Sequence, residues 1–180
     1  DIRTGAIPTT LPEFDAAEKE VKERLEGLVN NKGIHSVDYY HKQLGNIMWN
    51  KCGMSRNEKG LKEAIEEIAA LREDFWKNVS VPGGAYELNP ELEKAGRVAD
   101  FLELGELFAK DALDRNESCG GHFREESVEV GGPQDGEALR DDENYAYVAA
   151  WEYKGKPSEA VLHKEQLEFN DIKLTQRSYK

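Results

Sequence analysis

The stretch that decides the fold runs from Asn57 to Ser80 and reads NEKGLKEAIEEIAALREDFWKNVS. Its apolar residues recur at spacings of three and four, which is the period of one face of an α-helix. They are Leu61, Ala64, Ile65, Ile68, Leu71, Phe75, Trp76 and Val79. Asn57 is a favourable N-cap residue, and Pro82-Gly83-Gly84 follows the run directly. We therefore expect one long helix between these two signals.

Similar patterns predict further helices on both sides of this stretch. The earliest begins near Pro12, and its apolar stripe consists of Phe14, Ala17, Val21, Leu25 and Leu28. The next begins at Ser36, a good N-cap, and ends near Gly53, where a left-handed C-cap residue is expected. Asn89-Pro90 opens the last one, which is apolar over much of its circumference and is therefore expected to be central in a bundle.

The character of the sequence changes after Ser118. An aromatic and β-branched run from Tyr145 to Tyr153 favours a strand, and residues 161–169 favour a second one. This part has few core positions for its length, so it should pack against another surface. We predict a mainly α (α+β) chain: a bundle of three to four helices over residues 1–118, followed by a strand-and-loop extension over residues 119–180 that packs on the bundle.

Composition excludes several classes of function. The 180 residues carry a formal net charge of -12, which phosphate backbones would repel, so we expect no nucleic-acid partner. The sequence has no apolar run of the roughly 20 residues that a spanning helix needs, and its first residues lack the layout of a signal peptide. Any contact with a membrane should come through a partner protein.

The densest polar cluster is RNESCGGHFR, residues Arg115 to Arg124, which joins the last helix to the extension. A zinc site on Cys119 and His122 would have too few ligands. A catalytic Cys-His pair would need a fixed geometry that a Gly-Gly break does not supply. We favour a structural role, in which Arg and Glu side chains satisfy the helix end and His122 anchors the turn. Two isolated cysteines, Cys52 and Cys119, suit a reducing compartment.

A second polar cluster, Arg140 to Tyr145, is interpreted as a turn leading into a strand. It lacks the glycine and the alternating oxygen ligands of a calcium loop. The prominent aromatic residues are interpreted as core side chains rather than as a stacking surface for a ring ligand. They are Trp49, Phe75, Trp76, Tyr145, Trp151 and Tyr153. The sequence contains no G-x-G-x-x-G, P-loop or G-x-S-x-G motif.

The two polar clusters together resemble a known family. Arg115-x-Glu117-Ser118-x-Gly120-x-His122-x-Arg124, followed by Arg140-Asp141-Asp142-x-Asn144, is similar to R-x-E-S-R-G-A-H-x-R and R-D-D-x-N-W. These patterns mark the C-terminal domain of succinate dehydrogenase and fumarate reductase flavoprotein subunits. Further similar stretches are Gly53–Arg56, Gly96–Leu107 and the close Arg177-Ser178-Tyr179.

The chain departs from the family pattern at several positions. Cys119 stands in place of an arginine, Gly121 in place of an alanine and Tyr145 in place of a tryptophan. A Gly-rich insertion, residues 131–136, separates the two motifs. The sequence C-G-G-H resembles that of one bacterial subgroup, so the changes suggest a subfamily feature. Because of these changes, the role that the replaced arginine has in the family has no arginine to perform it at position 119 of this chain.

The resemblance implies interconversion of succinate and fumarate by an oxidoreductase with covalently attached FAD, which passes electrons to an iron-sulfur subunit. In the family the flavin and the substrate are bound by N-terminal flavin and capping domains. We therefore expect no catalytic, cofactor-binding or metal-ligating residue here, and no activity of the isolated chain. The implied partners are the chain's own N-terminal flavin domain, an iron-sulfur subunit and membrane anchor subunits. The implied location is the bacterial cytoplasm, on the cytoplasmic face of the inner membrane.

The motif residues are expected to form a docking site that holds the extension against the bundle or the flavin domain. The candidates are Arg115, Glu117, His122, Arg124, Arg140, Asp141 and Asn144. Two alternatives stay open: an autonomous helical protein-interaction module, and the C-terminal domain of an L-aspartate oxidase. Because Asp1 is not a methionine and the first ten residues resemble a linker, we expect the chain to be cut from a longer protein.

Overall fold

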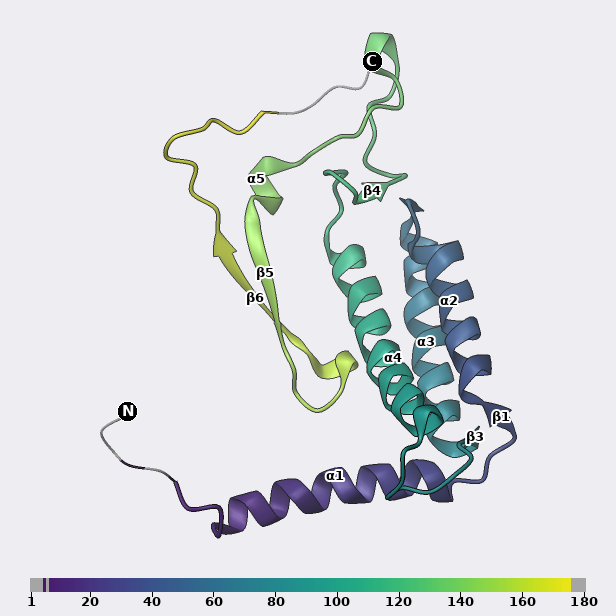
Figure 1. Cartoon of the computed structure of the whole chain (residues 1–180). Helices are drawn as coiled ribbons and strands as arrows, with labels where there is room; N and C mark the ends of the chain where they lie inside the picture. Colours follow the sequence, from purple (N-terminus) through teal and green to yellow (C-terminus); the bar gives the residue numbers. More distant parts are fainter. Residues whose placement is uncertain (1–4, 6, 176–180) are drawn as a thin grey trace.

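The computed structural model describes residue 5 and residues 7–175, so the close around Arg177 lies outside the described residues. Three long helices pack side by side, namely α2 (Val37–Cys52), α3 (Glu58–Asn78) and α4 (Pro90–Asp114) (Figure 1). A fourth, α1 (Pro12–Asn30), lies across one end of this bundle. Among the described residues no helix is both long and apolar enough to span a membrane.

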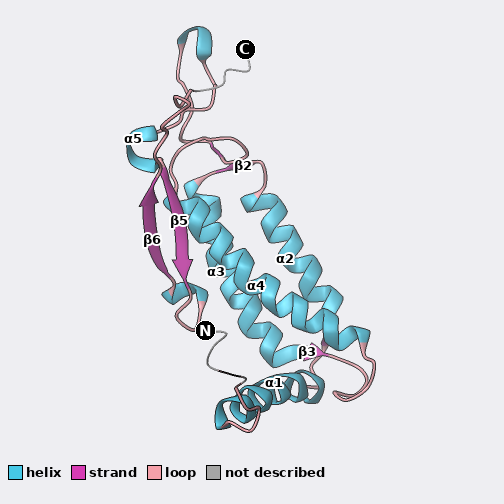
Figure 2. Ribbon diagram, turned by 60° about the vertical axis from the view of Figure 1, so that its left-hand side comes forward, coloured by secondary structure: helices cyan, strands magenta, loops and turns pink. Residues whose placement is uncertain are grey.

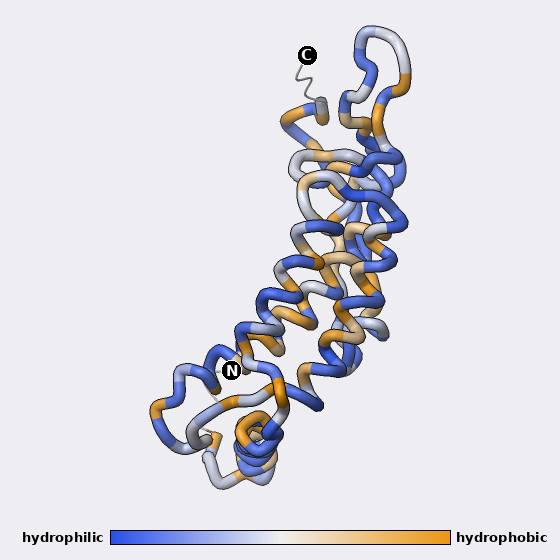
Figure 3. The backbone as a smooth tube through the Cα atoms, turned by 90° about the vertical axis from the view of Figure 1, so that its right-hand side faces the viewer, coloured by the Kyte–Doolittle hydropathy of each residue, from blue (hydrophilic) through white to orange (hydrophobic). Residues whose placement is uncertain are grey.

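The core lies between α2, α3 and α4. The rings of Tyr40 and Phe75 meet edge to face at 5.2 Å between centroids, and both side chains are fully buried. Ile68 and Leu102 are fully buried in the same core. Burying each such side chain contributes about 1.5–3 kcal/mol, so the bundle rests on apolar burial. Hydrophobic and hydrophilic residues alternate along the helices in Figure 3, as one-sided burial requires.

The predicted helix starts are confirmed by their caps. The side chains of Ser36, Asn57 and Asn89 each accept a hydrogen bond from the backbone N–H three residues further on. The prediction of a left-handed Gly53 is wrong, since its φ is -66°. Glycine is needed there because a Cβ would lie 2.6 Å from the carbonyl oxygen of Trp49.

The apolar stripe of α1 is mostly exposed, and the prediction that the prominent aromatic residues are core side chains is partly wrong. In α1 only Leu28 is fully buried, whereas Phe14 and Val21 are 47% and 59% exposed, because the helix meets the bundle only near its C-terminal end. The interpretation of the aromatic residues as core side chains holds for Phe75 but fails for Trp49, which is 83% exposed, and for the exposed Trp76 and Tyr153.

A short parallel pair of strands lies at each end of the bundle. Strand β1 (His35–Ser36) pairs with β3 (Val79–Ser80), and β2 (Ser55–Arg56) pairs with β4 (Phe123–Arg124). Beside the first pair, a Cβ on Gly33 would lie 1.9 Å from the carbonyl oxygen of Asn78. Only glycine therefore allows the chain to pass so close to the end of α3.

The extension runs back along α4 (Figures 1 and 2). It contains β4, a 3-10 turn at Gly132–Gln134, helix α5 (Asp142–Tyr145), and strands β5 (Tyr147–Glu152) and β6 (Val161–Gln166) on either side of a second 3-10 turn. The two strands pair antiparallel, with Tyr147 opposite Gln166. The prediction of a mainly α chain, with a helical bundle followed by strands, is confirmed.

Candidate functional site

The end of α4 is completed by a buried arginine. The last turn of a helix leaves backbone carbonyls without partners inside the helix. Nη1 of Arg124 donates to the carbonyl oxygens of Ala112 (2.9 Å), Leu113 (3.2 Å) and Arg115 (3.4 Å). Its Nε donates to Glu126 at 3.1 Å, and the residue is only 2% exposed. The guanidinium is thus a side-chain cap, and its buried charge is compensated by four acceptors.

A tight turn places this arginine. The backbone N–H of Cys119 donates to the carbonyl of His122 at 2.8 Å, and the return bond is 3.0 Å. Gly120 has φ +59°, a left-handed conformation that glycine adopts at no steric cost. The buried hydroxyl of Ser118 accepts from the N–H of Arg124 at 2.8 Å and donates to its carbonyl at 3.1 Å. The Gly-Gly segment therefore folds as a two-residue turn that directs Arg124 onto α4.

His122 connects this turn to the other end of the sequence motif and to α2. Its Nε2 lies 2.7 Å from the carbonyl oxygen of Arg115, and its Nδ1 lies 2.7 Å from Nη1 of Arg56. A carbonyl only accepts and a guanidinium only donates, so the ring is neutral, with its proton on Nε2. Burial lowers the pKa of His122, and the nearby arginines lower it further, while the hydrogen bond to the Arg115 carbonyl opposes part of this shift. Both nitrogens are engaged, so the imidazole has none left to activate Cys119.

Arg56 is itself fixed in place. Its Nε donates to the carbonyl of Gly53 at 2.9 Å, and its guanidinium lies over the ring of Phe108, 5.0 Å from the centroid. It follows α2 and belongs to β2, which pairs with β4. Through Arg56 the turn around His122 is therefore held by α2 as well as by α4.

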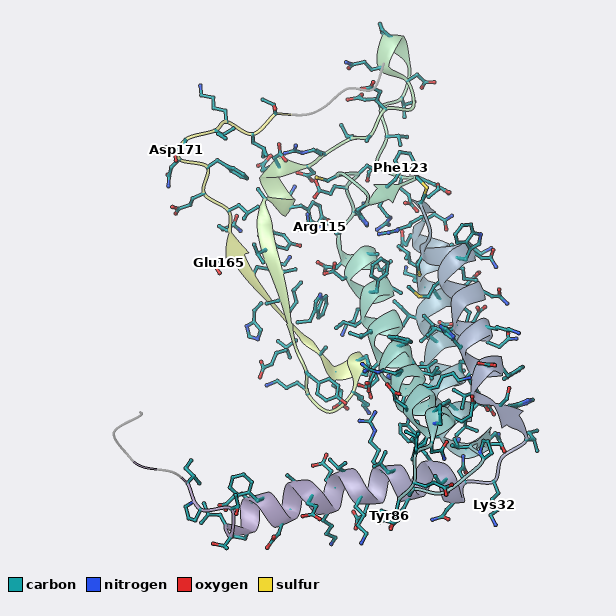
Figure 4. All side chains as sticks on the ribbon, viewed as in Figure 1. Lys32, Tyr86, Arg115, Phe123, Glu165 and Asp171 are labelled. Atoms are coloured by element: carbon teal, nitrogen blue, oxygen red, sulfur yellow. The ribbon has the colours of Figure 1, made fainter. Side chains whose placement is uncertain are left out.

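Glu117 and Arg115 link the end of α4 to the strands. The buried carboxylate of Glu117 accepts from Nη1 of Arg115 at 2.8 Å and from the backbone N–H of Asp141 at 3.0 Å. Nη2 of Arg115 donates to the carbonyl of Tyr147, the first residue of β5, at 3.2 Å. In Figure 4 Arg115 lies between α4 and α5, while Phe123 marks β4 on the other side of α4.

The remaining candidates border this network. Asp141 caps α5 by accepting from the N–H of Asn144 at 3.1 Å, and the Asn144 amide donates back to the carboxylate at 2.9 Å. Arg140 donates to Asp142 and, through Nη1, to the carbonyl of Thr175 at 3.1 Å. The Asp142 carboxylate raises the pKa of Arg140. The structure thus brings Arg115, Glu117, His122, Arg124 and Asp141 into one bonded network, with Arg140 and Asn144 at its edge.

A second set of contacts attaches the extension to α4 one turn before the helix ends. Nζ of Lys110 donates to the carbonyls of Pro157 (3.2 Å) and Ala160 (3.1 Å) and lies 4.8 Å from the centre of the Trp151 ring. The indole N–H of Trp151 donates to Asp111 at 2.7 Å. Sequence reasoning missed Lys110, and it missed Arg56 as the partner of His122. The Gly53–Arg56 resemblance was the one signal that pointed at Arg56.

Few polar groups of this network are available to bind a ligand. Within residue 5 and residues 7–175, no three His, Cys, Asp or Glu side chains gather closely enough to hold a metal ion. A dinucleotide site would need a Gly-rich turn between a strand and a helix, with free donors for phosphates. The polar side chains of the network already bond one another.

The fold and the network define a helical bundle with a strand extension fastened to it by charged side chains. A family model described as "Fumarate reductase flavoprotein C-term" matches residues 41–179. The chain therefore belongs to the family of fumarate reductase flavoprotein C-terminal domains, as the resemblance of the two motifs implied.

Individual relatives agree with this assignment. The fumarate reductase flavoprotein subunit of Haemophilus influenzae is 27% identical over 163 residues, which is 89% of this chain and 24% of that protein. L-aspartate oxidase 1 of Ralstonia nicotianae is 32% identical over 123 residues, which is 67% of this chain and 20% of that protein. The chain thus spans about a quarter or less of the length of these relatives.

Among solved structures, a chain of quinol fumarate reductase from E. coli aligns with a TM-score of 0.78 at 22% identity. The alignment covers 96% of this chain and 28% of that chain. At this identity the likeness establishes the fold of the bundle and extension.

Proposed function

We propose that this chain is the C-terminal domain of the flavoprotein subunit of a succinate dehydrogenase or fumarate reductase. The whole subunit would interconvert succinate and fumarate with FAD and pass electrons to an iron-sulfur subunit. The observation that carries the proposal is the family match over residues 41–179, combined with the folding of both motifs into one network at the end of α4.

Within that subunit the chain would act as a structural and docking domain. Residues 1–118 would form the helical bundle, and residues 119–180 would pack on the bundle and on the flavin domain. FAD would lie outside this chain, which fits the engagement of the network's polar groups with one another. Anchor subunits would hold the complex on the cytoplasmic face of a bacterial inner membrane.

An uncovered apolar surface supports the docking role. Between α2 and α4 runs an open groove, lined in part by Met48, Phe101, Leu104 and Phe108. The three α4 side chains are all exposed. Contiguous apolar surface of this kind on a water-soluble domain usually marks an interface. We propose that another domain of the same subunit covers it.

Purification from the source cells tests the activity. A tag at the C-terminus of this chain should recover a flavoprotein that reduces a dye with succinate as donor and oxidises a reduced viologen with fumarate as acceptor. A second candidate, L-aspartate oxidase, is favoured by the 32% identity to the Ralstonia enzyme. Oxidation of L-aspartate without succinate oxidation would support that candidate and overturn the first.

Substitution of Arg124 tests the docking role. In the full-length subunit, Arg124→Ala should reduce both thermal stability and flavin content, because the end of α4 and the extension would no longer be held in place. Arg97→Ala is the matched control, because Arg97 is an exposed arginine that forms an ion pair with Glu93 at 3.8 Å. Unchanged flavin content and thermal stability in Arg124→Ala would contradict a docking role for the motif.

A further inference from the structure

The contacts of His122 are compatible with only one protonation state. The ring nitrogen Nδ1 must accept from Arg56, while Nε2 must donate to the carbonyl of Arg115. A second proton on Nδ1 would place an N–H against a guanidinium N–H at 2.7 Å. Two donors cannot form a hydrogen bond, so a protonated ring has to leave this position.

The surroundings of His122 also oppose a positive charge. Arg56 on β2, Arg115 after α4 and Arg124 on β4 each place a cation near the ring. Beyond Arg56, at the end of α2, lies the thiol of Cys52, whose pKa is raised by burial, so it supplies no negative charge. The carboxylates nearest these arginines are already engaged: Glu117 with Arg115, and Glu126 with Arg124.

We propose that His122 is an acid-sensitive latch: in its neutral form it holds the turn of residues 119–124 to β2, and a second proton releases the turn from β2. The released element would be the β2–β4 pairing, which includes the bond from the N–H of Glu125 to the carbonyl of Arg56 at 2.8 Å. The cap formed by Arg124 would remain, because a guanidinium keeps its charge at all relevant pH values. The inference concerns this chain alone and does not depend on the proposed function.

The direction of the pH effect follows from the lowered pKa of His122. The folded state binds fewer protons at this site than the unfolded state does, so acid favours opening. The stability of the latch is fully present above the ordinary pKa of about 6.5. It falls as the pH decreases through that value toward the lowered pKa. Opening should increase about tenfold for each unit by which the pKa is lowered.

Two measurements on the 180-residue chain test the latch. NMR titration follows the imidazole signals, and hydrogen exchange at matched pH values, corrected for intrinsic rates, follows the amide of Glu125 against α3 amides. We expect His122 to titrate below the ordinary histidine value of about 6.5, and the amide of Glu125 to lose protection over that same pH range while α3 amides do not. In His122→Gln, which cannot gain a proton, Glu125 protection should be independent of pH.

His163→Gln is the matched control, because His163 is an exposed histidine that bonds Glu152 at 2.9 Å, and it should behave as the unaltered chain does. If His122→Gln does not fold, the unaltered chain still decides the question. The latch would be overturned if His122 titrated at or above the ordinary value of about 6.5, or if Glu125 protection did not change around the His122 midpoint.

Discussion

The bundle and the extension are held by different forces. Between α2, α3 and α4 the contacts are apolar and buried, with Tyr40 and Phe75 at the centre. Among its described residues the extension contributes one buried aromatic, Tyr147, and it is otherwise attached at α4 through hydrogen bonds of Arg124, Glu117 and Lys110. Apolar burial is the main stabilising contribution in the first region, whereas hydrogen-bonded charges fix the second in one position without giving it a core.

The largest effect is expected in the bundle. Phe75→Ala removes a fully buried ring that contacts Tyr40 and Trp76, so the free energy of unfolding should fall by about 3–5 kcal/mol. Urea unfolding of the 180-residue chain measures it. A loss below about 1 kcal/mol would mean that the bundle does not rest on this core.

The next largest effect tests the polar fastening. Arg124→Ala leaves the carbonyls at the end of α4 without their partner and frees Glu126, so we expect a loss of about 3 kcal/mol in the same urea experiment. Arg97→Ala, at an exposed ion pair, should change stability by less than about 0.5 kcal/mol. If the two substitutions lowered the free energy of unfolding equally, Arg124 would contribute no more than an exposed surface charge, and the role of Arg124 as a helix cap would be contradicted.

A smaller and more local effect is expected at the hairpin of β5 and β6. Lys110→Met keeps the aliphatic stem but removes the hydrogen bonds to Pro157 and Ala160 and the contact with Trp151. Protection of β5 amides against hydrogen exchange should fall by about 1 kcal/mol, while α3 amides stay unchanged. A parallel loss in α3 would show that the bundle and the extension unfold as one unit.

The smallest effect is expected in α1. Phe14→Ser should change the free energy of unfolding by less than about 0.5 kcal/mol, since the side chain is mostly exposed. A loss above about 1 kcal/mol would show that the apolar stripe of α1 packs against the bundle after all.

Local signals explain what could be predicted from the sequence. The period of α3 and the capping side chains of Ser36, Asn57 and Asn89 depend on neighbours three or four residues away, and these helices were predicted well. The stripe of α1 has the same period, but a period says only that one face is apolar. It does not say which partner covers that face, and in this structure most of the stripe is exposed.

Contacts between distant residues explain what could not be predicted. Arg56 meets His122 across 66 positions, and Glu117 meets the N–H of Asp141 across 24. The family resemblance pointed to the motif residues, but spacing along the chain gives no information on which of them bond each other. The neutral state of His122 in particular follows only from seeing a carbonyl at one nitrogen and a guanidinium at the other.

The most direct test of the central claim is the size and flavin content of the protein that carries this sequence in its source cells. A denaturing gel would be probed with an antibody to this chain and imaged for flavin fluorescence in the same lane. Because the chain corresponds to 24% of a fumarate reductase flavoprotein subunit, we expect one reactive band several times larger than 20.3 kDa, with fluorescence that survives denaturation. A single band near 20.3 kDa without fluorescence would contradict the account and favour an autonomous interaction module.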